Sequence, residues 1–263
     1  MRIVFLGTGG YHPNERRHTA GIFLPDLGLL LDAGTGTFRL GRFLKHPELT
    51  ILLSHAHLDH VVGLTYLLPF LNAGTLRRIR LLGTAATLRA VDEHLFSERL
   101  FPVRVPAETA VVGNEPLQWH PPGATGRPLT VTAFPLPCHR GGSTGYRLDG
   151  PSGSFAYVTD TGPDDSYVER IRGVDVLIHE CNFPDDQHEW AERTGHCYLS
   201  HVLRIAERAA AGRLWLTHLD PTLTGPDPLG LDTSSTAARL RRSGMTIAVA
   251  EDLTEFTLTA SSS

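Results

Sequence analysis

The stretch SHAHLDH at positions 54–60 decides how the rest of the chain is interpreted. It follows the apolar run Ile51–Leu53, which is typical of a buried strand. Strand alternation places His55 and His57 on one side, while the aspartate and the third histidine lie in the following turn and can face a second point. Neutral imidazoles with a carboxylate favour Zn, Mn or Fe over Ca or Mg. The stretch therefore predicts a metal site, and two such groups imply two ions about 3.5 to 4 Å apart.

Composition restricts the classes of protein that come into question. The chain has 263 residues, of which 41% are hydrophobic, so one enzyme-sized domain over residues 1–263 is expected. A net charge of -4 argues against a general nucleic-acid or membrane-surface binder, because polyanion affinity rests on clustered Lys and Arg. No stretch approaches the roughly 20 apolar residues that span a bilayer, and no signal peptide is recognised, so a cytoplasmic location is expected. Three widely spaced cysteines suggest no disulfide framework.

Apolar runs of strand type alternate with helical stretches from end to end, which predicts a layered α/β fold. The expected strands cover 2–6, 20–24, 28–32, 50–54, 78–82, 129–136, 143–148, 153–160, 175–180, 213–218, 246–250 and 255–259. The expected helices cover 36–44, 60–71, 84–96, 164–172, 199–211 and 232–242. The Pro-rich region 101–128 is interpreted as a loop-rich insertion within one domain.

Several of the expected strands end on a potential metal ligand or on an acid. In a layered α/β fold such strand ends gather at one edge of a sheet, where ligand sites form. A single histidine at a strand end is more often a satisfied core or surface residue, but six strands that end in this way are difficult to explain by packing. The residues concerned are Asp32, the group 55–60, His139, Asp160, His179 with Glu180, and His218.

The order and spacing of these motifs resemble the metallo-β-lactamase superfamily along nearly the whole chain. Within it the likeness is to ribonuclease Z and its relatives. It rests on the segments FLGTGG, LLLDAGTGT, SHAHLDH, HRGGSTGYRL, LIHECNF, TGHCYLSHVLRIA and LTHLDP. The resemblance implies a four-layer αβ/βα sandwich and a hydrolase with two divalent metal ions, Zn first and Mn or Fe as alternatives.

The resemblance also implies roles for individual positions. The first ion would be held by His55, His57 and His139, and the second by Asp59, His60 and His218, with Asp160 bridging both. Asp32 would accept a hydrogen bond from a motif histidine and fix its tautomer. The expected catalytic residues are Asp59, Glu180 and His196. The other interpretation of His196 is a histidine at a helix start with no chemistry.

The expected mechanism follows from charge. Two divalent ions lower the pKa of a bridging water toward neutrality, so that hydroxide attacks, and they offset the charge that builds on a phosphoryl oxygen. His196, held by Glu180, would protonate the departing alkoxide.

Other positions carry weaker expectations. GTGG at 7–10 is interpreted as a tight turn at the site rim. His12, Arg16, Arg17 and His18 are candidates for substrate contact or for plain solvent exposure, and the Gly-rich turn at Ser143 and Thr144 for phosphate binding or an ordinary turn. Cys138 and Cys181 are expected to be buried beside the site.

The length of one segment, between His139 and Asp160, limits which substrates are expected. Ribonuclease Z enzymes usually carry a flexible basic arm between the third-motif histidine and the bridging aspartate, and here only twenty residues separate His139 from Asp160. The leading hypothesis is therefore a phosphodiesterase for small or cyclic nucleotide-type diesters. The alternatives are a tRNA 3′-end endoribonuclease, a hydrolase of a lactam or thioester bond, and a non-catalytic protein on this fold. A small phosphodiester or an RNA is the expected partner, no membrane is expected, and a homodimer is left open.

Overall fold

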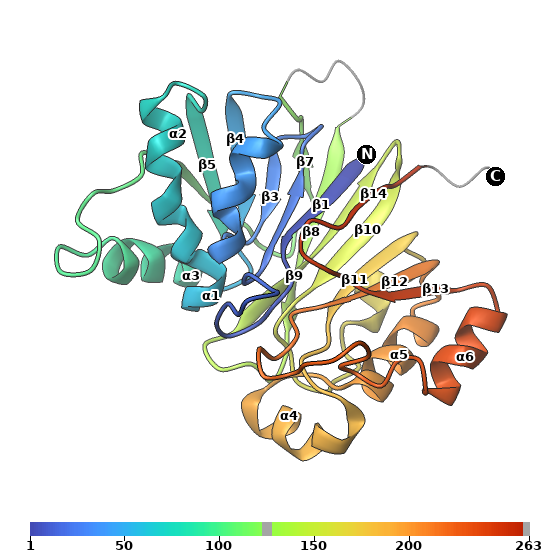
Figure 1. Cartoon of the computed structure of the whole chain (residues 1–263). Helices are drawn as coiled ribbons and strands as arrows, with labels where there is room; N and C mark the ends of the chain where they lie inside the picture. The colour runs from blue at the N-terminus through green and yellow to red at the C-terminus, as the bar shows by residue number, and fades with distance from the viewer. Residues whose placement is uncertain (123–127, 260–263) are drawn as a thin grey trace.

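Two seven-stranded sheets face each other in the computed structural model, which describes residues 1–122 and 128–259 (Figure 1). The first sheet has the order β14-β1-β2-β3-β4-β5-β6 and the second the order β13-β12-β11-β10-β9-β8-β7. The strands of the first are β1 (Arg2–Gly7), β2 (Gly21–Leu24), β3 (Leu29–Leu31), β4 (Glu48–Leu52), β5 (Arg78–Gly83), β6 (Glu108–Val111) and β14 (Glu255–Thr257). Those of the second are β7 (Leu117–Trp119), β8 (Leu129–Leu136), β9 (Ser143–Gly150), β10 (Gly153–Val158), β11 (Val176–Glu180), β12 (Arg213–Thr217) and β13 (Thr246–Val249).

Helices cover the outer faces of the two sheets. On the first sheet lie α1 (Leu58–Val61), α2 (Leu68–Asn72) and α3 (Ala85–Ala90), with the 3-10 helices η1 (Thr35–Arg42) and η2 (Val62–Leu67) and the π-helical turn η3 (Val91–Leu95). On the second lie α5 (Leu199–Arg208) and α6 (Ser235–Arg242); the chain also forms η4 (Val168–Ile171), η5 (Asp185–Gln187) and α4 (His188–Thr194). Figure 1 shows this order of helices, sheet, sheet and helices, which is the expected four-layer αβ/βα sandwich.

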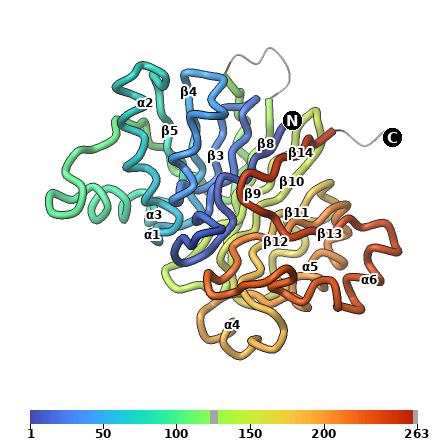
Figure 2. Tube along the Cα trace, in the orientation of Figure 1, coloured from blue at the N-terminus to red at the C-terminus, as the bar shows by residue number. Residues whose placement is uncertain are grey.

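The path of the chain divides between the sheets almost in sequence order, as the tube in Figure 2 shows. The exception is β14, which returns at the end of the described chain and pairs antiparallel with β1, Arg2 opposite Thr257. A further backbone link runs from the Leu258 amide to the Met1 carbonyl at 2.9 Å. The C-terminal strand therefore closes the edge of the sheet that the N-terminal strand opens.

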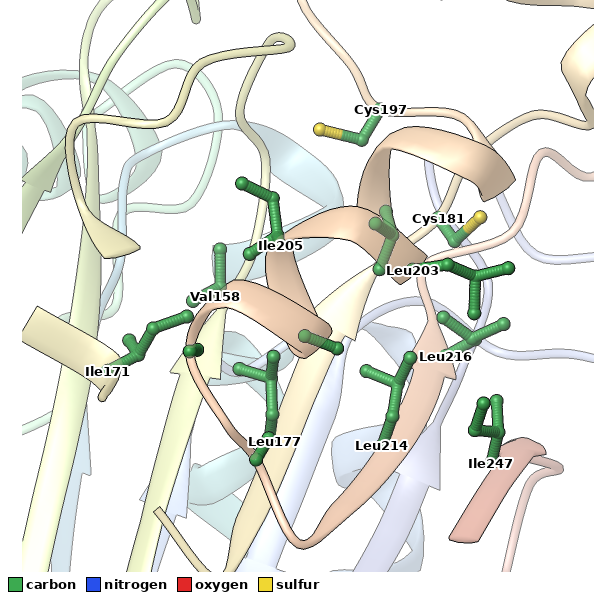
Figure 3. Close-up of a cluster of buried hydrophobic side chains, with 14 of the residues drawn as sticks. Val158, Ile171, Leu177, Cys181, Cys197, Leu203, Ile205, Leu214, Leu216 and Ile247 are labelled. Atoms are coloured by element: carbon green, nitrogen blue, oxygen red, sulfur yellow. The ribbon is translucent and has the colours of Figure 1, made fainter. Parts of the chain in front are cut away.

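Side-chain alternation explains why each sheet has a helix-facing side and a sheet-facing side. In β1, Ile3 and Phe5 pack between the sheets, while Val4 and Leu6 pack toward the helices of the first half. In β12, Leu214 and Leu216 face the helices of the second half. Figure 3 shows these two leucines with Leu177 beneath Leu203 and Ile205 of α5. Three apolar layers thus hold the four layers of secondary structure together.

The strand directions decide where the polar strand ends meet. β3 to β6 are parallel to one another, as are β10 to β13. The carboxyl ends of parallel strands lie on one edge of a sheet, so the residues that follow β3, β4, β10, β11 and β12 are brought to that edge.

Three sequence predictions need correction. Region 101–128 is more than a loop, because β6 and β7 lie in it and form one edge of each sheet; residues 123–127 of it lie outside the described part. The helix predicted for 164–172 is limited to the 3-10 turn η4, after a Pro-Asp-Asp sequence that favours turns. The helix predicted for 60–71 is divided into α1, η2 and α2.

Within the described residues, no helix combines the length and the apolar character that crossing a membrane requires.

Candidate metal centre

The seven predicted ligands come together at the shared edge of the two sheets. They form two groups, His55, His57, His139 and Asp160 in one, and Asp59, His60, His218 and Asp160 in the other. The first sheet supplies the residues that follow β4, and the second supplies those that follow β8, β10 and β12. The site therefore spans the gap between the sheets, and it forms only when both sheets are packed.

In the first group, three imidazoles surround one carboxylate oxygen. Asp160 Oδ2 lies 3.6 Å from His55 Nε2 and 3.7 Å from His139 Nε2. His139 Nε2 lies 3.1 Å from His57 Nδ1. His55 and Asp160 are buried, whereas His57 is exposed, so this group opens to solvent on one side as a site for an external substrate requires.

In the second group, the other oxygen of the same carboxylate takes the central place. Asp160 Oδ1 lies 3.1 Å from both His60 Nε2 and His218 Nε2, and these two nitrogens lie 3.1 Å from each other. Asp59 Oδ2 lies 3.3 Å from His218 Nε2 and 3.4 Å from His60 Nε2. Asp160 thus presents one oxygen to each group.

These spacings fit a tetrahedrally coordinated cation in each group. Ligands placed at about 2.0 to 2.2 Å from a tetrahedral Zn ion lie roughly 3.3 to 3.6 Å from one another, close to the separations above. His55 Nε2 is buried and has no hydrogen-bond partner among the described residues, which is costly unless the nitrogen binds something. Imidazole nitrogens that face one another at 3.1 Å likewise direct lone pairs to one point. The donor set therefore fits divalent cations.

Asp32 holds the second group in place, as the sequence predicted. It lies just after β3 in the left-handed region, with φ of 53°, and its side chain is fully buried. Its Oδ2 accepts hydrogen bonds from His60 Nδ1 at 2.9 Å and from Tyr157 Oη at 2.9 Å. Ser54 donates to both carboxylate oxygens, from its amide and its hydroxyl, each at 2.8 Å. Because a carboxylate only accepts, His60 carries its proton on Nδ1 and turns Nε2 toward the group.

His218 depends on two neighbours whose function the sequence did not reveal. It also adopts the left-handed conformation, with φ of 60°. The Asn182 side-chain amide donates to the His218 carbonyl at 2.7 Å. Gly10 lies against the ring, and a Cβ there would stand 2.5 Å from His218 Cε1. GTGG lies against the site as predicted, but it is an extended segment rather than a tight turn, because Gly7 ends β1 and Gly9 forms isolated bridges with Thr19 and Leu219.

Two backbone groups also contact the ligands, and no residue type in the sequence reveals them. The amide of Tyr11 donates to Asp59 Oδ2 at 2.9 Å. His139 Nδ1 donates to the carbonyl of Gly195 at 3.2 Å, which leaves Nε2 directed into the first group. Gly195 follows α4 in the left-handed conformation, and a Cβ there would stand 2.6 Å from the Cys138 carbonyl. Only glycine therefore brings its own carbonyl within hydrogen-bond distance of His139.

The buried Glu180 and the half-buried His196 form a pair beside the two groups. His196 Nδ1 donates to Glu180 Oε1 at 3.1 Å, and Glu180 also accepts from the amides of Thr161 and Asn182 at 2.9 and 3.2 Å. Burial would lower the pKa of His196, but the Glu180 carboxylate outweighs it and raises that pKa to about 9. The ligand atoms of Glu180, His196 and His218 lie close enough to form a third candidate metal group.

The electrostatics of the two groups favour a bound cation. Burial alone would lower the pKa of His60, but the carboxylates of Asp160, Asp59 and Asp32 outweigh it and raise the pKa well above its ordinary value. The pKa of His55 is held well below its ordinary value, first by burial and then by the neighbouring His60. The acidic residues therefore attract positive charge while His55 stays neutral, which is the form that binds a metal.

Four other positions for which the sequence carried expectations do not belong to the two ligand groups. Arg17 is buried, and its guanidinium donates to Thr8 Oγ1, the Ala250 carbonyl and Glu251, so neither predicted alternative, substrate contact or solvent exposure, is correct for it. Arg16 binds Glu251 as well. Cys181 is buried as predicted. Cys138 is exposed, contrary to its prediction, because it lies in the open turn after β8 with φ of 63°.

A family model of the β-lactamase superfamily domain matches residues 28–219, which is most of the chain and contains all seven candidate ligands. The chain belongs to the metallo-β-lactamase superfamily. Ribonuclease Z of Pyrobaculum calidifontis is 30% identical over 262 residues, covering 83% of this chain and 86% of that protein, and this relative places the chain in the ribonuclease Z-like branch. As a member of this branch, the chain is a metal-dependent hydrolase.

Solved structures support the same fold. The metallo-β-lactamase fold protein YhfI of Bacillus subtilis has a TM-score of 0.74 at 24% identity, covering 97% of this chain and 98% of that one. A diphosphatase from the PhnP family has a TM-score of 0.69 at 21% identity, with 99% of both chains covered. Divalent metal ions are thus implied by the superfamily, and the two ligand groups of this member are fitted to hold them.

Proposed function

We propose that this hydrolase is a dinuclear metal-dependent phosphodiesterase, acting on a small or cyclic nucleotide-type diester. The observation that carries the proposal is the position of Asp160, whose two carboxylate oxygens each face a separate ligand group. His55, His57 and His139 would hold the first ion and Asp59, His60 and His218 the second, with Asp160 shared. Zn is the expected metal, with Mn or Fe as alternatives. Bound there, two such ions would supply Lewis acidity and a water of lowered pKa.

The protein's own residues supply proton transfer and orientation. His196, kept protonated by Glu180, would donate the proton that a departing alkoxide requires. Glu180 is fixed by two backbone amides, so it holds the His196 ring in one orientation. Asp32 and the Gly195 carbonyl fix the tautomers of His60 and His139. A phosphodiester needs both functions, since its alkoxide leaving group is poor without a proton.

A small substrate is favoured by the hairpin that joins the two halves of the ligand set. Between His139 and Asp160 the chain forms the turn His139–Gly142, then β9, the turn Gly150–Gly153 and β10. The hairpin leaves no residues for an arm that would bind a folded RNA. The PhnP-family diphosphatase, which has a similar fold, acts by its name on a diphosphate.

The test is hydrolysis of bis(p-nitrophenyl) phosphate by the purified protein with added Zn²⁺ or Mn²⁺. We expect release of p-nitrophenol that Asp160→Ala abolishes, because this substitution removes one ligand from both groups. Inactivity of the wild-type protein with every divalent metal and every diester tested would overturn the proposal.

Cleavage of a precursor tRNA is the second candidate function, favoured by the ribonuclease Z relative at 30% identity. That alignment has 262 positions, although it contains only 83% of the residues of this chain. The remaining positions are residues of the relative that have no counterpart here. An endonuclease of this kind would cut a precursor tRNA at its 3′ end, with a steep dependence on salt. Nitrocefin or thioester hydrolysis in place of diester hydrolysis would instead favour the lactam or thioester alternative.

A further inference from the structure

A cavity of about 190 Å³ adjoins the first ligand group. It lies between the ends of β4 and β5, the start of α3, the segment after β6 and the turn from β8 to β9. Ser54 forms part of its wall, and Ser54 Oγ lies 3.0 Å from His55 Nδ1. One residue of the cavity wall is therefore in hydrogen-bond contact with a candidate metal ligand.

The lining of the cavity is uncharged, and more of it is apolar than polar. The described residues around it include no Lys, Arg, Asp, Glu or His. A charged phosphate would lose its hydration there without gaining a counter-charge, which is unfavourable. Hydroxyl and amide groups instead suit a neutral ligand with several hydroxyls of its own. The polar side chains are Ser54, Thr84, Thr87, Asn114, Ser143 and Thr144.

Two of these side chains retain unused hydrogen-bonding capacity. Ser143 is buried, and its Oγ has no partner among the described residues. Thr84 Oγ1 accepts from the Thr87 amide at 3.1 Å and lies 2.9 Å from Thr87 Oγ1. Only one of the two threonine hydrogens can lie between these oxygens, so the other is left for a ligand. A buried hydroxyl without a partner is costly, and a ligand hydroxyl would remove that cost.

The position of the cavity indicates which part of a diester it would hold. His196, the proton donor for the leaving group, lies between α4 and α5, and neither helix contributes to the cavity. The other substituent on phosphorus is therefore the one directed toward the cavity. The mouth is kept open by Gly141 and Gly142, which have φ of 85° and 79° and nothing within 4 Å of where a Cβ would stand.

We propose that this cavity binds the sugar of the nucleoside that stays on the phosphorus when the leaving group departs. The proposal rests on the phosphodiesterase function proposed above, and it adds which part of the substrate this cavity holds. At about 190 Å³ the cavity has room for roughly six waters at about 30 Å³ each, which suits a pentose rather than a folded nucleic acid. Thr87 and Ser143 would be its specificity-determining residues.

Two substrates with the same leaving group test this directly. Uridine 5′-(p-nitrophenyl phosphate) and methyl p-nitrophenyl phosphate differ only in the group that stays on phosphorus. We expect Thr87→Val and Ser143→Ala each to raise KM for the uridine substrate about fivefold, the effect of one lost hydrogen bond, and to leave the methyl substrate unchanged. Thr132→Val, on β8 outside the cavity, is the matched control and should change neither.

Equal effects of Thr87→Val and Ser143→Ala on both substrates, or no effect on either, would overturn the sugar site. Failure of the wild-type protein to hydrolyse either substrate would instead overturn the phosphodiesterase function. In that case calorimetric titration with uridine decides about the cavity alone: weaker binding by Thr87→Val than by Thr132→Val supports it, and equal binding overturns it.

Discussion

Single residues at the sheet edge are oriented by neighbours that do not face the metal groups themselves. Asp32 and His218 both adopt the left-handed backbone conformation, which non-glycine residues rarely take and which costs about 1 to 3 kcal/mol. This conformation turns each side chain back from the strand end toward the other sheet. The cost is tolerated because Tyr157 and Asn182 hydrogen-bond the strained residues. The site is therefore built from paired residues, one that faces the groups and one that fixes it.

His196→Ala should separate substrates by leaving group. A p-nitrophenolate ion departs without a proton, whereas an alkoxide needs one, so the loss should be small for bis(p-nitrophenyl) phosphate and about 100-fold or more for a dinucleoside monophosphate. The measurement is kcat for both substrates, with Glu180→Gln expected to follow the same pattern more weakly. An equal loss for both substrates would show that His196 holds structure or metal instead.

His179 should make the folded state sensitive to acid. Burial holds the pKa of His179 at about 4, while Nδ1 donates to the Glu180 carbonyl at 2.6 Å and Nε2 accepts from Tyr167 Oη at 2.8 Å. The neutral ring fits both bonds. Because the unfolded value is higher, near 6.5, this contribution to stability is complete above about pH 6.5 and is lost as pH falls toward 4.

The measurement for His179 is urea unfolding at pH 7 and pH 5. Between these values the wild-type protein should lose about 2 kcal/mol more free energy of unfolding than His179→Gln, whose amide does not titrate. Parallel losses in both proteins would contradict the assignment.

At the scale of elements, the loops that follow the strands carry most of the site, and they were the least predictable parts. The strands themselves followed from apolar runs between turn residues, and β1, β4, β8, β11 and β12 lie where they were expected. Helix α4 was missed, although Pro184 and two aspartates before it and Gly195 after it are helix start and stop signals. The short β6 and β7 were missed because their pairing with β5 and β8 comes from tertiary contacts.

The site residues also divide into those that the sequence predicted and those that it did not. The seven candidate ligands, Asp32, Glu180 and His196 follow recognisable motifs, and the structure brings them together. Asn182, the Tyr11 amide and the Gly195 carbonyl gave no such signal. A backbone group looks the same in every sequence, and its role appears only when the turn that carries it is folded.

Gly10→Ala should damage the second metal group from the adjacent loop. A Cβ at this position would stand 2.5 Å from His218 Cε1, so the ring must shift away from Asp59 and Asp160. We expect the affinity for the second ion to fall about tenfold or more, comparable to the loss of a supporting residue. The measurement is competition for Zn²⁺ with a chromophoric chelator. Gly21→Ala is the control, because its Cβ would meet only ordinary contacts at 3.6 Å; the same loss in both variants would contradict the prediction.

At the scale of the whole molecule, the metal groups join the two sheets. Residues after β4 come from the first sheet and His139, Asp160 and His218 from the second, so each bound ion would cross-link the halves of the sandwich. Cation binding and sheet packing are then coupled, since the ligand geometry exists only in the folded protein.

Metal removal should therefore lower thermal stability. An ion held at a free concentration 100 times its Kd stabilises the folded state by about 2.7 kcal/mol, so chelation should lower Tm by several degrees. Scanning calorimetry with and without EDTA measures this, and Asp160→Ala should show a much smaller response. The same response in wild type and variant would place the stabilising ions elsewhere.

We propose that two ions held by these seven side chains make one phosphodiesterase site. The most direct measurement is the initial rate of bis(p-nitrophenyl) phosphate hydrolysis by metal-free protein, followed as Zn²⁺ or Mn²⁺ bound per chain is increased. We expect the rate to stay low while only the first ion is bound and to level off at about two ions per chain. A full rate with one ion bound, or no hydrolysis with two, would contradict it.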